Sequence, residues 1–197
     1  MKATIKNTFA ALVLPACAAL SLLSTTATTQ AAAYMKLGDI KGEATDSGHQ
    51  EWIIIESMSS PIYRALVTDP ATGVQRQRGD VVLGDIVCIK ELDKSSPKLA
   101  ESVCTGTVFP EVEIHFTKTI DNGDGTTSEV PYLKYKLTNV LVSSYSFHGN
   151  AAGDPLPTEE ITLGYTEVEW TYITQAADGS GSVTYVGTCD ATPSGTP

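Results

Sequence analysis

The side chains in this sequence that most often act as acids, bases or metal ligands are its three histidines. They are His49, His115 and His148, and none lies in an H-E-x-x-H motif or in a Cys/His spacing typical of zinc sites. His115 lies at an outward position of a predicted strand, which favours an ordinary surface histidine. Because the sequence also lacks a G-x-S-x-G motif, nothing in it brings a serine nucleophile together with a base.

Two pairs of glutamates and one acidic turn are the remaining candidates for chemistry. The pairs Glu159–Glu160 and Glu167/Glu169 have the residue types of acid–base catalysis, but they are more typical of the solvated face of an acidic strand. The turn DNGDG at 121–125 fails the EF-hand pattern, because glycines occupy its third and fifth positions, and it predicts a hairpin instead. We therefore predict no catalytic residue, no cofactor and no metal ligand, and a protein that is not an enzyme.

The chemistry of the cysteines depends on the compartment. Cys17 lies in an N-terminal segment that resembles an export signal, so Cys88, Cys104 and Cys189 remain beyond it. In an oxidising compartment three cysteines allow one disulfide and one leftover thiol. Cys88 lies late in a predicted strand and Cys104 near the end of the next helix, and this short loop favours a Cys88–Cys104 disulfide. The remaining thiol is then either buried or available to link two subunits.

Residues 1–33 have the features of a secretory signal peptide. Lys2 and Lys6 give a positive start, residues 9–23 form an apolar run, and Ala31–Ala33 offers an A-x-A cleavage site. A transmembrane anchor is the alternative, but about 15 apolar residues are fewer than the ~20 that span a bilayer. The signal predicts export through the general secretory pathway, to the periplasm or the outside of the cell.

A lipoprotein signal is a second alternative for the N-terminus, because residues 14–17 (LPAC) resemble a lipobox that is processed at Cys17. Pro15 is unusual in such a motif, and apolar residues continue past the cysteine, as they do in an uncut signal. We therefore predict that the mature protein is a single domain of residues 34–197.

The net charge of the chain limits its partners. Removal of residues 1–33 takes away two lysines and no acid, so the net charge changes from −10 to −12. A strongly acidic domain is repelled by phosphate backbones and by anionic lipid surfaces, which argues against a nucleic-acid partner. We also predict no membrane span in the mature chain, because no later segment is long and apolar enough.

Apolar residues alternate with period two along most of the mature chain, which indicates β-strands separated by turns. The three isoleucines at 53–55 suggest a strand that is buried on both faces, and a change of phase near Thr166–Glu167 suggests a β-bulge. The predicted strands cover 34–37, 50–56, 81–92, 111–119, 133–138, 140–147, 160–173 and 182–186.

One short amphipathic helix is predicted within residues 92–106. Ser95 or Ser96 can serve as its N-cap, Pro97 suits the first turn and Gly106 can end it, while Leu99 and Val103 share one face. Residues 59–80 are rich in Ser, Pro, Gly, Arg and Gln and predict a long loop, of the kind that is ordered by a partner. Many strands, frequent turns and one helix predict a mainly β fold, a β-barrel of two packed sheets with one short flanking helix.

Three stretches of the chain carry a more specific pattern. They are residues 34–57 (YMKLGDIKGEATDSGHQEWIIIES), residues 92–106 (LDKSSPKLAESVCTG) and residues 137–149 (LTNVLVSSYSFHG), the last leading into residues 157–185. In order and spacing they resemble the haemolysin-coregulated protein (Hcp) family, the tube subunit of the bacterial type VI secretion system. The resemblance covers essentially all of the mature chain and implies an Hcp-like barrel without an enzymatic site.

The resemblance also implies assembly. Members of the family form hexameric rings with a wide channel, the rings stack into a tube, and small effectors travel in the channel. The long loop after the second strand helps rings to stack, and by order along the chain it corresponds to residues 59–80. At the level of this region, the implied stacking residues are Pro61, Arg64, Asp69, Arg76 and Arg78.

The predicted signal peptide departs from the family pattern, because tube subunits assemble in the cytoplasm. The first functional hypothesis is therefore an exported, non-enzymatic homologue of the tube protein that forms homo-oligomeric rings and contacts small effectors or components of the secretion apparatus. The alternative is a secreted, monomeric binding or adhesion module that reuses the barrel. A small secreted hydrolase is a third reading, which no group of residues supports.

Overall fold

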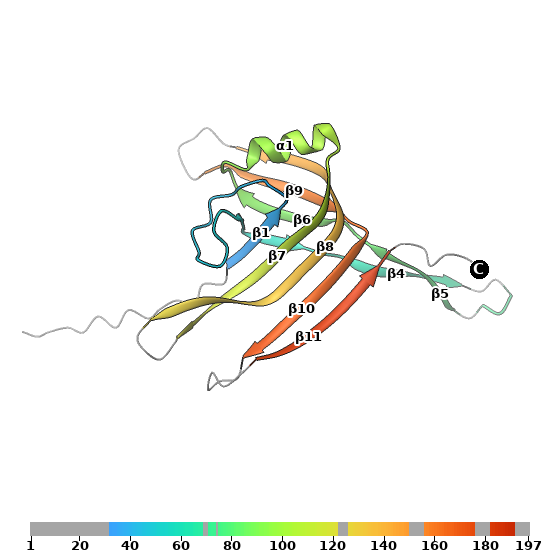
Figure 1. Ribbon diagram of the computed structural model, residues 1–197. Helices are drawn as coiled ribbons and strands as arrows, with labels where there is room; N and C mark the ends of the chain where they lie inside the picture. The colour runs from blue at the N-terminus through green and yellow to red at the C-terminus, as the bar shows by residue number, and fades with distance from the viewer. Residues whose placement is uncertain are drawn as a thin grey trace, which may run out of the picture.

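A computed structural model of the protein describes residues 32–68, 71–73, 75–121, 126–149, 156–175 and 182–191. Within these ranges the chain forms eleven strands and one helix (Figure 1). The helix is α1 (Ser96–Thr105), and the strands are β1 (Ala32–Leu37), β2 (Ile53–Ile55), β3 (Ser57–Ser59), β4 (Ile62–Thr68), β5 (Gln75–Leu83), β6 (Ile86–Glu91), β7 (Val108–Asp121), β8 (Thr127–His148), β9 (Thr158–Gly164), β10 (Glu167–Gln175) and β11 (Ser182–Asp190).

Nine of these strands form one antiparallel sheet, in the order β2-β1-β7-β8-β9-β6-β3, with β10 and β11 branching from β8. The sheet curls strongly, since its two end strands, β2 and β3, are separated in the chain by Glu56 alone. The Glu56 amide donates a hydrogen bond to the Ile89 carbonyl of β6 at 2.8 Å. The fold is therefore an open β-barrel, and the predicted mainly β architecture with two sheets and one helix is confirmed.

The core of the barrel is built from alternate residues of its strands, because successive side chains of a strand point to opposite faces. In β2 this alternation corrects a prediction: Ile53 and Ile55 are buried, but Ile54 is 45% exposed, so the strand is not buried on both faces. The fully enclosed apolar side chains come from most of the barrel strands and from α1, and include Met35, Leu37, Ile86, Leu99, Ile114, Leu137, Ile161 and Leu163.

The long strand β8 joins two parts of the sheet. Its first half pairs with β10 and its second half with β9, and Asn139, with a φ of 51°, lies at the change. The predicted single strand with a bulge near Thr166–Glu167 is wrong. The chain forms two strands there, because β9 ends at Gly164 and β10 begins at Glu167. The Thr166 amide bonds the Thr138 carbonyl at 3.1 Å, so both strands keep β8 as their neighbour.

Helix α1 lies over the barrel at the top of the view in Figure 1 and confirms the predicted helix. Ser95 is the N-cap, and Pro97 fits the first turn because no intrahelical bond is required of its nitrogen. Gly106 ends the helix with a φ of 65°, a conformation that glycine adopts without steric cost. Leu99 points from the helix into the core.

The predicted loop at 59–80 is wrong. Strands β4 and β5 occupy most of this region and pair with each other as a separate two-stranded sheet, from Ile62↔Leu83 to Thr68↔Gln75. Figure 1 shows this hairpin extending away from the barrel. The strand-forming runs IYRALV and VVL favour this pairing, and the polar residues between them concealed it in the sequence.

Candidate assembly surfaces and the polar clusters beneath them

The last strand, β11, carries an exposed apolar surface at the edge of the large sheet. Along its length β11 pairs with β10, its strand neighbour among the described residues. Tyr185 is 60% exposed and Val186 is 62% exposed, so both faces of this strand are open. Edge strands with apolar side chains are sites of association with other chains. We call Tyr172, Val183, Tyr185 and Val186, all exposed, the β11 surface.

A second exposed surface lies at the base of the β4–β5 hairpin. We call Pro61, Ile62, Tyr63, Arg64 and Val82, all exposed, the hairpin surface. Gly84 closes this base: its amide bonds the Pro61 carbonyl at 2.9 Å, and a Cβ at this glycine would lie 2.7 Å from the Pro61 ring. The two chain segments at the base of the hairpin therefore lie close together and are joined by a hydrogen bond.

The residues that the resemblance implied for stacking fall on this hairpin only in part. Pro61 and Arg64 are exposed at its base. Arg76 and Arg78 lie in β5, where Arg78 pairs with Leu66 of β4. Asp69 lies outside the described residues. The four described residues therefore all lie in the β4–β5 hairpin or at its base.

A small groove opens where β2, β6 and the start of β9 meet. Its volume is about 120 Å³, and three exposed apolar side chains, Ile54, Leu92 and Leu156, contribute to its wall. Its other lining residues are all acidic: Glu43, Glu56, Glu91 and Asp93. We call these seven residues the acidic groove. Its chemistry, apolar with a negative rim, suits an apolar side chain next to a cation.

A buried ionic cluster lies directly behind this groove. The side chains of Lys90 and Glu159 are 1% and 0% exposed, and Lys90 Nζ lies 2.9 Å from Glu159 Oε2. Lys90 also contacts Asp93 Oδ1 at 2.8 Å and donates to the Glu91 carbonyl at 2.6 Å. The prediction that Glu159 belongs to a solvated acidic face is therefore wrong, because a strand lysine and the start of α1 enclose it.

Two hydroxyl groups also donate hydrogen bonds to the buried Glu159 carboxylate. Ser96 at the start of α1 donates to Oε2 at 2.8 Å, and Tyr145 of β8 donates to Oε1 at 2.6 Å. Burial and the Glu159 carboxylate raise the pKa of Tyr145 to about 12, so this phenol stays a donor. The cluster connects β6, β8, β9 and α1. Asp93 and Ser96 of the DKSSP motif, residues 93–97, belong to it and hold the helix on the barrel.

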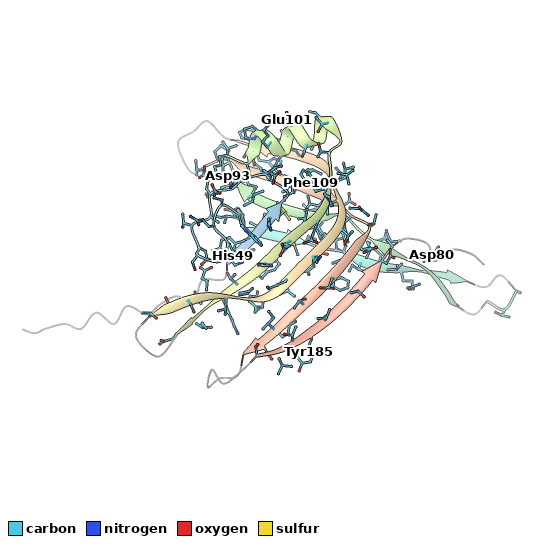
Figure 2. All side chains as sticks on the ribbon, viewed as in Figure 1. His49, Asp80, Asp93, Glu101, Phe109 and Tyr185 are labelled. Carbon is cyan, nitrogen blue, oxygen red and sulfur yellow. The ribbon has the colours of Figure 1, made fainter. Side chains whose placement is uncertain are left out.

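A second cluster holds the loop between β1 and β2 against the barrel. The His49 Nδ1–H group donates to Asp46 Oδ2 at 2.7 Å, and a second hydrogen bond of 2.9 Å joins His49 Nε2 and His115 Nδ1. Tyr34 stacks on His49 with ring centroids 4.5 Å apart, and Trp52 lies within 4.9 Å of the His49 centroid. Figure 2 shows His49 on this loop beside the barrel.

The predicted surface position of His115 is therefore wrong. The residue is 8% exposed, because the loop covers the outer face of β7 on which it lies. Burial, together with the charges of Lys134, His49 and Lys36, lowers the pKa of His115 to about 4. Sequence alternation located its strand face correctly but carried no signal of the loop, whose His49 is 66 residues away.

The cysteines are free thiols in the described part of the chain. Cys88 is buried in the core, and burial raises the pKa of its thiol to about 12, whereas Cys104 is exposed at the end of α1. The Cys88–Cys104 disulfide stays a prediction.

Within the described ranges, no group of three or more His, Cys, Asp or Glu side chains could hold a metal ion. The same residues include no helix long and apolar enough to cross a membrane.

Together these features define a class of protein: a mainly β fold with a flanking helix, a projecting hairpin and an exposed edge strand. A family model described as "Type VI secretion system effector, Hcp" matches residues 34–172. The chain therefore belongs to the Hcp family, as the sequence resemblance indicated, and is a homologue of the type VI secretion tube protein. Members of this family are structural proteins and not enzymes.

Individual relatives agree with this assignment. The Protein hcp1 of Pseudomonas aeruginosa is 33% identical over 147 residues, which cover 75% of this chain and 86% of that protein. A solved structure of a type six secretion system protein matches with a TM-score of 0.66 and 28% identity, over 81% of this chain and 93% of that one. Hcp1 from Salmonella typhimurium shares the fold, with a TM-score of 0.62, 22% identity and coverage of 82% and 95%.

Proposed function

We propose that the protein is an exported tube subunit whose mature chain forms hexameric rings, which stack and carry small effectors in their channel. The β11 surface is the observation that carries this proposal, because a monomer rarely exposes tyrosine and valine on both faces of an edge strand. Membership of the Hcp family supports it.

The sheet offers a complementary edge for β11. Strand β1 pairs with residues 112–117 of β7, whereas residues 118–121 lie beyond Ala32, the first described residue of β1, and pair with β8. Addition of β11 from one copy to residues 118–121 of the next would continue the sheet across the interface. Such a contact joins two different surfaces, so repeating it around an axis closes a ring.

Export is the second part of the proposal. We propose that residues 1–33 are a signal peptide and residues 34–197 the mature domain; residues 1–31 lie outside the described residues. Ala32 and Ala33 belong to β1, and the buried Thr117 hydroxyl donates to the Ala32 carbonyl at 3.2 Å. Mass spectrometry of the exported protein locates the cleavage site, and a non-reducing digest tests the Cys88–Cys104 disulfide.

The ring is tested by light scattering coupled to size exclusion, and by negative-stain electron microscopy, of residues 34–197. We expect a hexamer mass and ring-shaped particles. The double substitution Val183→Lys and Val186→Lys should convert rings to monomers without unfolding, since both side chains are exposed. Val108→Lys is the matched control, because Val108 is an equally exposed strand valine outside the β11 surface. Monomers of the unsubstituted protein at every concentration would instead support the monomeric binding module.

A further inference from the structure

Strand β1 enters the sheet beside the edge of β7 that the proposed ring contact uses. The two strands are antiparallel, with Ala32 opposite Thr117. Figure 1 shows β7 and β8 extending together beyond the described end of β1. Residues 28–31 precede Ala32 in the chain and lie outside the described residues. A continued register places them opposite residues 118–121 of β7, over about 13 Å of strand.

The two segments have a composition that suits a strand pair. Residues 28–31 read TTQA and residues 118–121 read KTID, and neither segment contains proline or glycine. Every residue therefore has an amide that can donate to a ladder, and the threonines and Ile120 favour extended backbone. Because residues 28–31 are uncharged, no like charges oppose each other across the pair.

This edge of β7 accepts one strand at a time, because each of its amides and carbonyls forms one ladder bond on that side. In the proposed ring, β11 of a second copy adds to residues 118–121. A segment of the same chain competes with it at an effective concentration in the millimolar range, since it is covalently joined to β1. A second copy at micromolar concentration is therefore excluded.

Cleavage after Ala33 would remove this competing segment and two further residues of β1. Ala32 and Ala33 pair with Thr117 and Phe116, so their loss extends the open edge to residues 116–121. That length matches the ~5–6 residues of an average strand.

The rest of β1 keeps its place after such a cut, because the Tyr34 side chain anchors it. The hydroxyl donates to Glu129 Oε2 at 2.9 Å, and the ring stacks on His49 with centroids 4.5 Å apart. Backbone pairing continues on both sides, with His115 of β7 and Ile54 of β2. The cut would thus open the edge without releasing the strand.

The folded barrel hides the cleavage site. Ala33 is 6% exposed and pairs with Phe116 on one side and with Ile55 on the other. A protease reaches a bond in an interior strand only when that part of the sheet opens, and opening is rare in a stable core. Cleavage therefore has to precede folding, and a chain that folds before export keeps residues 1–33.

We propose that residues 28–33 of the unprocessed chain occupy the β7 edge as an extension of β1 and block the addition of β11 from a second copy. Removal of residues 1–33 opens this edge, so rings form only from the exported, processed protein. This inference rests on the proposed function, because β11 is the strand that takes the open edge. A chain that folds before export stays monomeric.

The block is tested by comparing residues 34–197 with residues 28–197, which carry the extension without the apolar run. In light scattering coupled to size exclusion, we expect 28–197 to need at least tenfold more protein to form rings. The matched control is 28–197 with Gln30→Pro and Ala31→Pro, because the prolines cannot donate to β7. Its rings should form at a concentration close to that of 34–197.

Hydrogen exchange detects the extension without relying on rings. The substitutions Val183→Lys and Val186→Lys keep both chains monomeric for this comparison. We expect the amides of residues 118–121 that face away from β8 to exchange at least tenfold more slowly in 28–197 than in 34–197. The two prolines should remove this difference.

The outcomes separate the inference from the proposed function. Equal ring formation by 34–197 and 28–197 overturns the inference and leaves the ring in place. A proline control that assembles as poorly as 28–197 also overturns it, because the added residues would then act without pairing. A 34–197 chain that forms no rings overturns the proposed function and the block to assembly with it, whereas slow exchange in 28–197 would still show the paired extension. Delayed assembly of 28–197, recovery with the prolines and slow exchange together support the inference.

Discussion

Acid should loosen the barrel through His115, and the size of this effect follows from its buried position. The residue is 8% exposed and hydrogen-bonded to His49, and burial disfavours its charged form. Its pKa is lowered to about 4, whereas a histidine in the unfolded chain titrates near 6.5. Between these two values the unfolded state binds more protons than the folded state. Stability therefore falls as the pH falls from about 6.5 toward 4 and is unaffected by this group above 7.

The expected magnitude comes from the two pKa values. Lowering the pH from 7 to 5 protonates His115 almost fully in the unfolded chain and only slightly in the folded one, which costs about 2 kcal/mol of unfolding free energy. Glu113 opposes this cost, because its Oε2 atom lies 3.4 Å from His115 Nε2 and would stabilise an imidazolium. About 2 kcal/mol is therefore an upper figure, and the reduction is small because the Glu113 side chain is partly exposed and screened by solvent.

Urea unfolding at pH 7 and pH 5 measures this loss, and comparison with His115→Asn isolates it from the titration of the carboxylates. The asparagine amide can donate a hydrogen bond to His49 or accept one from it, but it does not titrate. We expect the wild type to lose up to about 2 kcal/mol more than the variant over this pH range. His148→Asn, which removes an exposed histidine, should leave the wild-type loss unchanged. Equal losses in wild type and His115→Asn would refute the reasoning.

Three further predictions concern the ionic cluster, the thiols and the hairpin. Glu159→Gln should lower the unfolding free energy by about 1.5–3 kcal/mol, because it removes one of the two carboxylates that contact the buried Lys90 ammonium group and leaves Asp93. Glu160→Gln on the same strand should change it by less than about 0.5 kcal/mol in the same urea assay. In reduced, folded protein, iodoacetamide should label Cys104 rapidly and Cys88 only on unfolding, because the Cys88 thiol is buried with a pKa of about 12; equal labelling rates by mass spectrometry would contradict this. Deletion of residues 65–79 should leave a barrel that unfolds cooperatively in circular dichroism, since β4 and β5 pair only with each other among the described strands, and loss of cooperative unfolding would show that the hairpin belongs to the core.

The strand pattern and the helix could be predicted because their signals are local. Alternation places Met35 and Leu37 or Ile161 and Leu163 on one face, and Pro97 and Gly106 mark both ends of α1. The positions of Glu159 and His115 could not be predicted this way, since what buries each of them lies 63 to 69 residues away in the chain. A lysine in the otherwise apolar run IVCIK, residues 86–90, was the one sequence signal of the ionic cluster, because a charge in a buried strand requires a partner.

The hairpin was missed for a different reason. Residues 62–68 and 81–83 have strand composition. The segment between these two runs contains Arg76, Arg78, Gly73 and Gly79 and resembles a loop. Polar strands are recognised poorly by alternation when they project from the barrel, since neither face needs to be apolar. The arginines that concealed β5 in the sequence lie, with Arg64 of β4, on this one hairpin.

The ionic cluster and the acidic groove share a residue, Asp93, so the DKSSP motif contributes to both. Asp93 accepts from the Ser95 amide at 2.9 Å, contacts Lys90 and lines the groove. Lys90 therefore fixes the position of the groove rim and also cancels one of its negative charges. Loss of Glu159 would leave Asp93 as the remaining carboxylate in contact with Lys90, and the groove would keep its three exposed glutamates. A Glu159→Gln protein should consequently keep one ionic contact at Lys90 and, through it, the position of the groove rim.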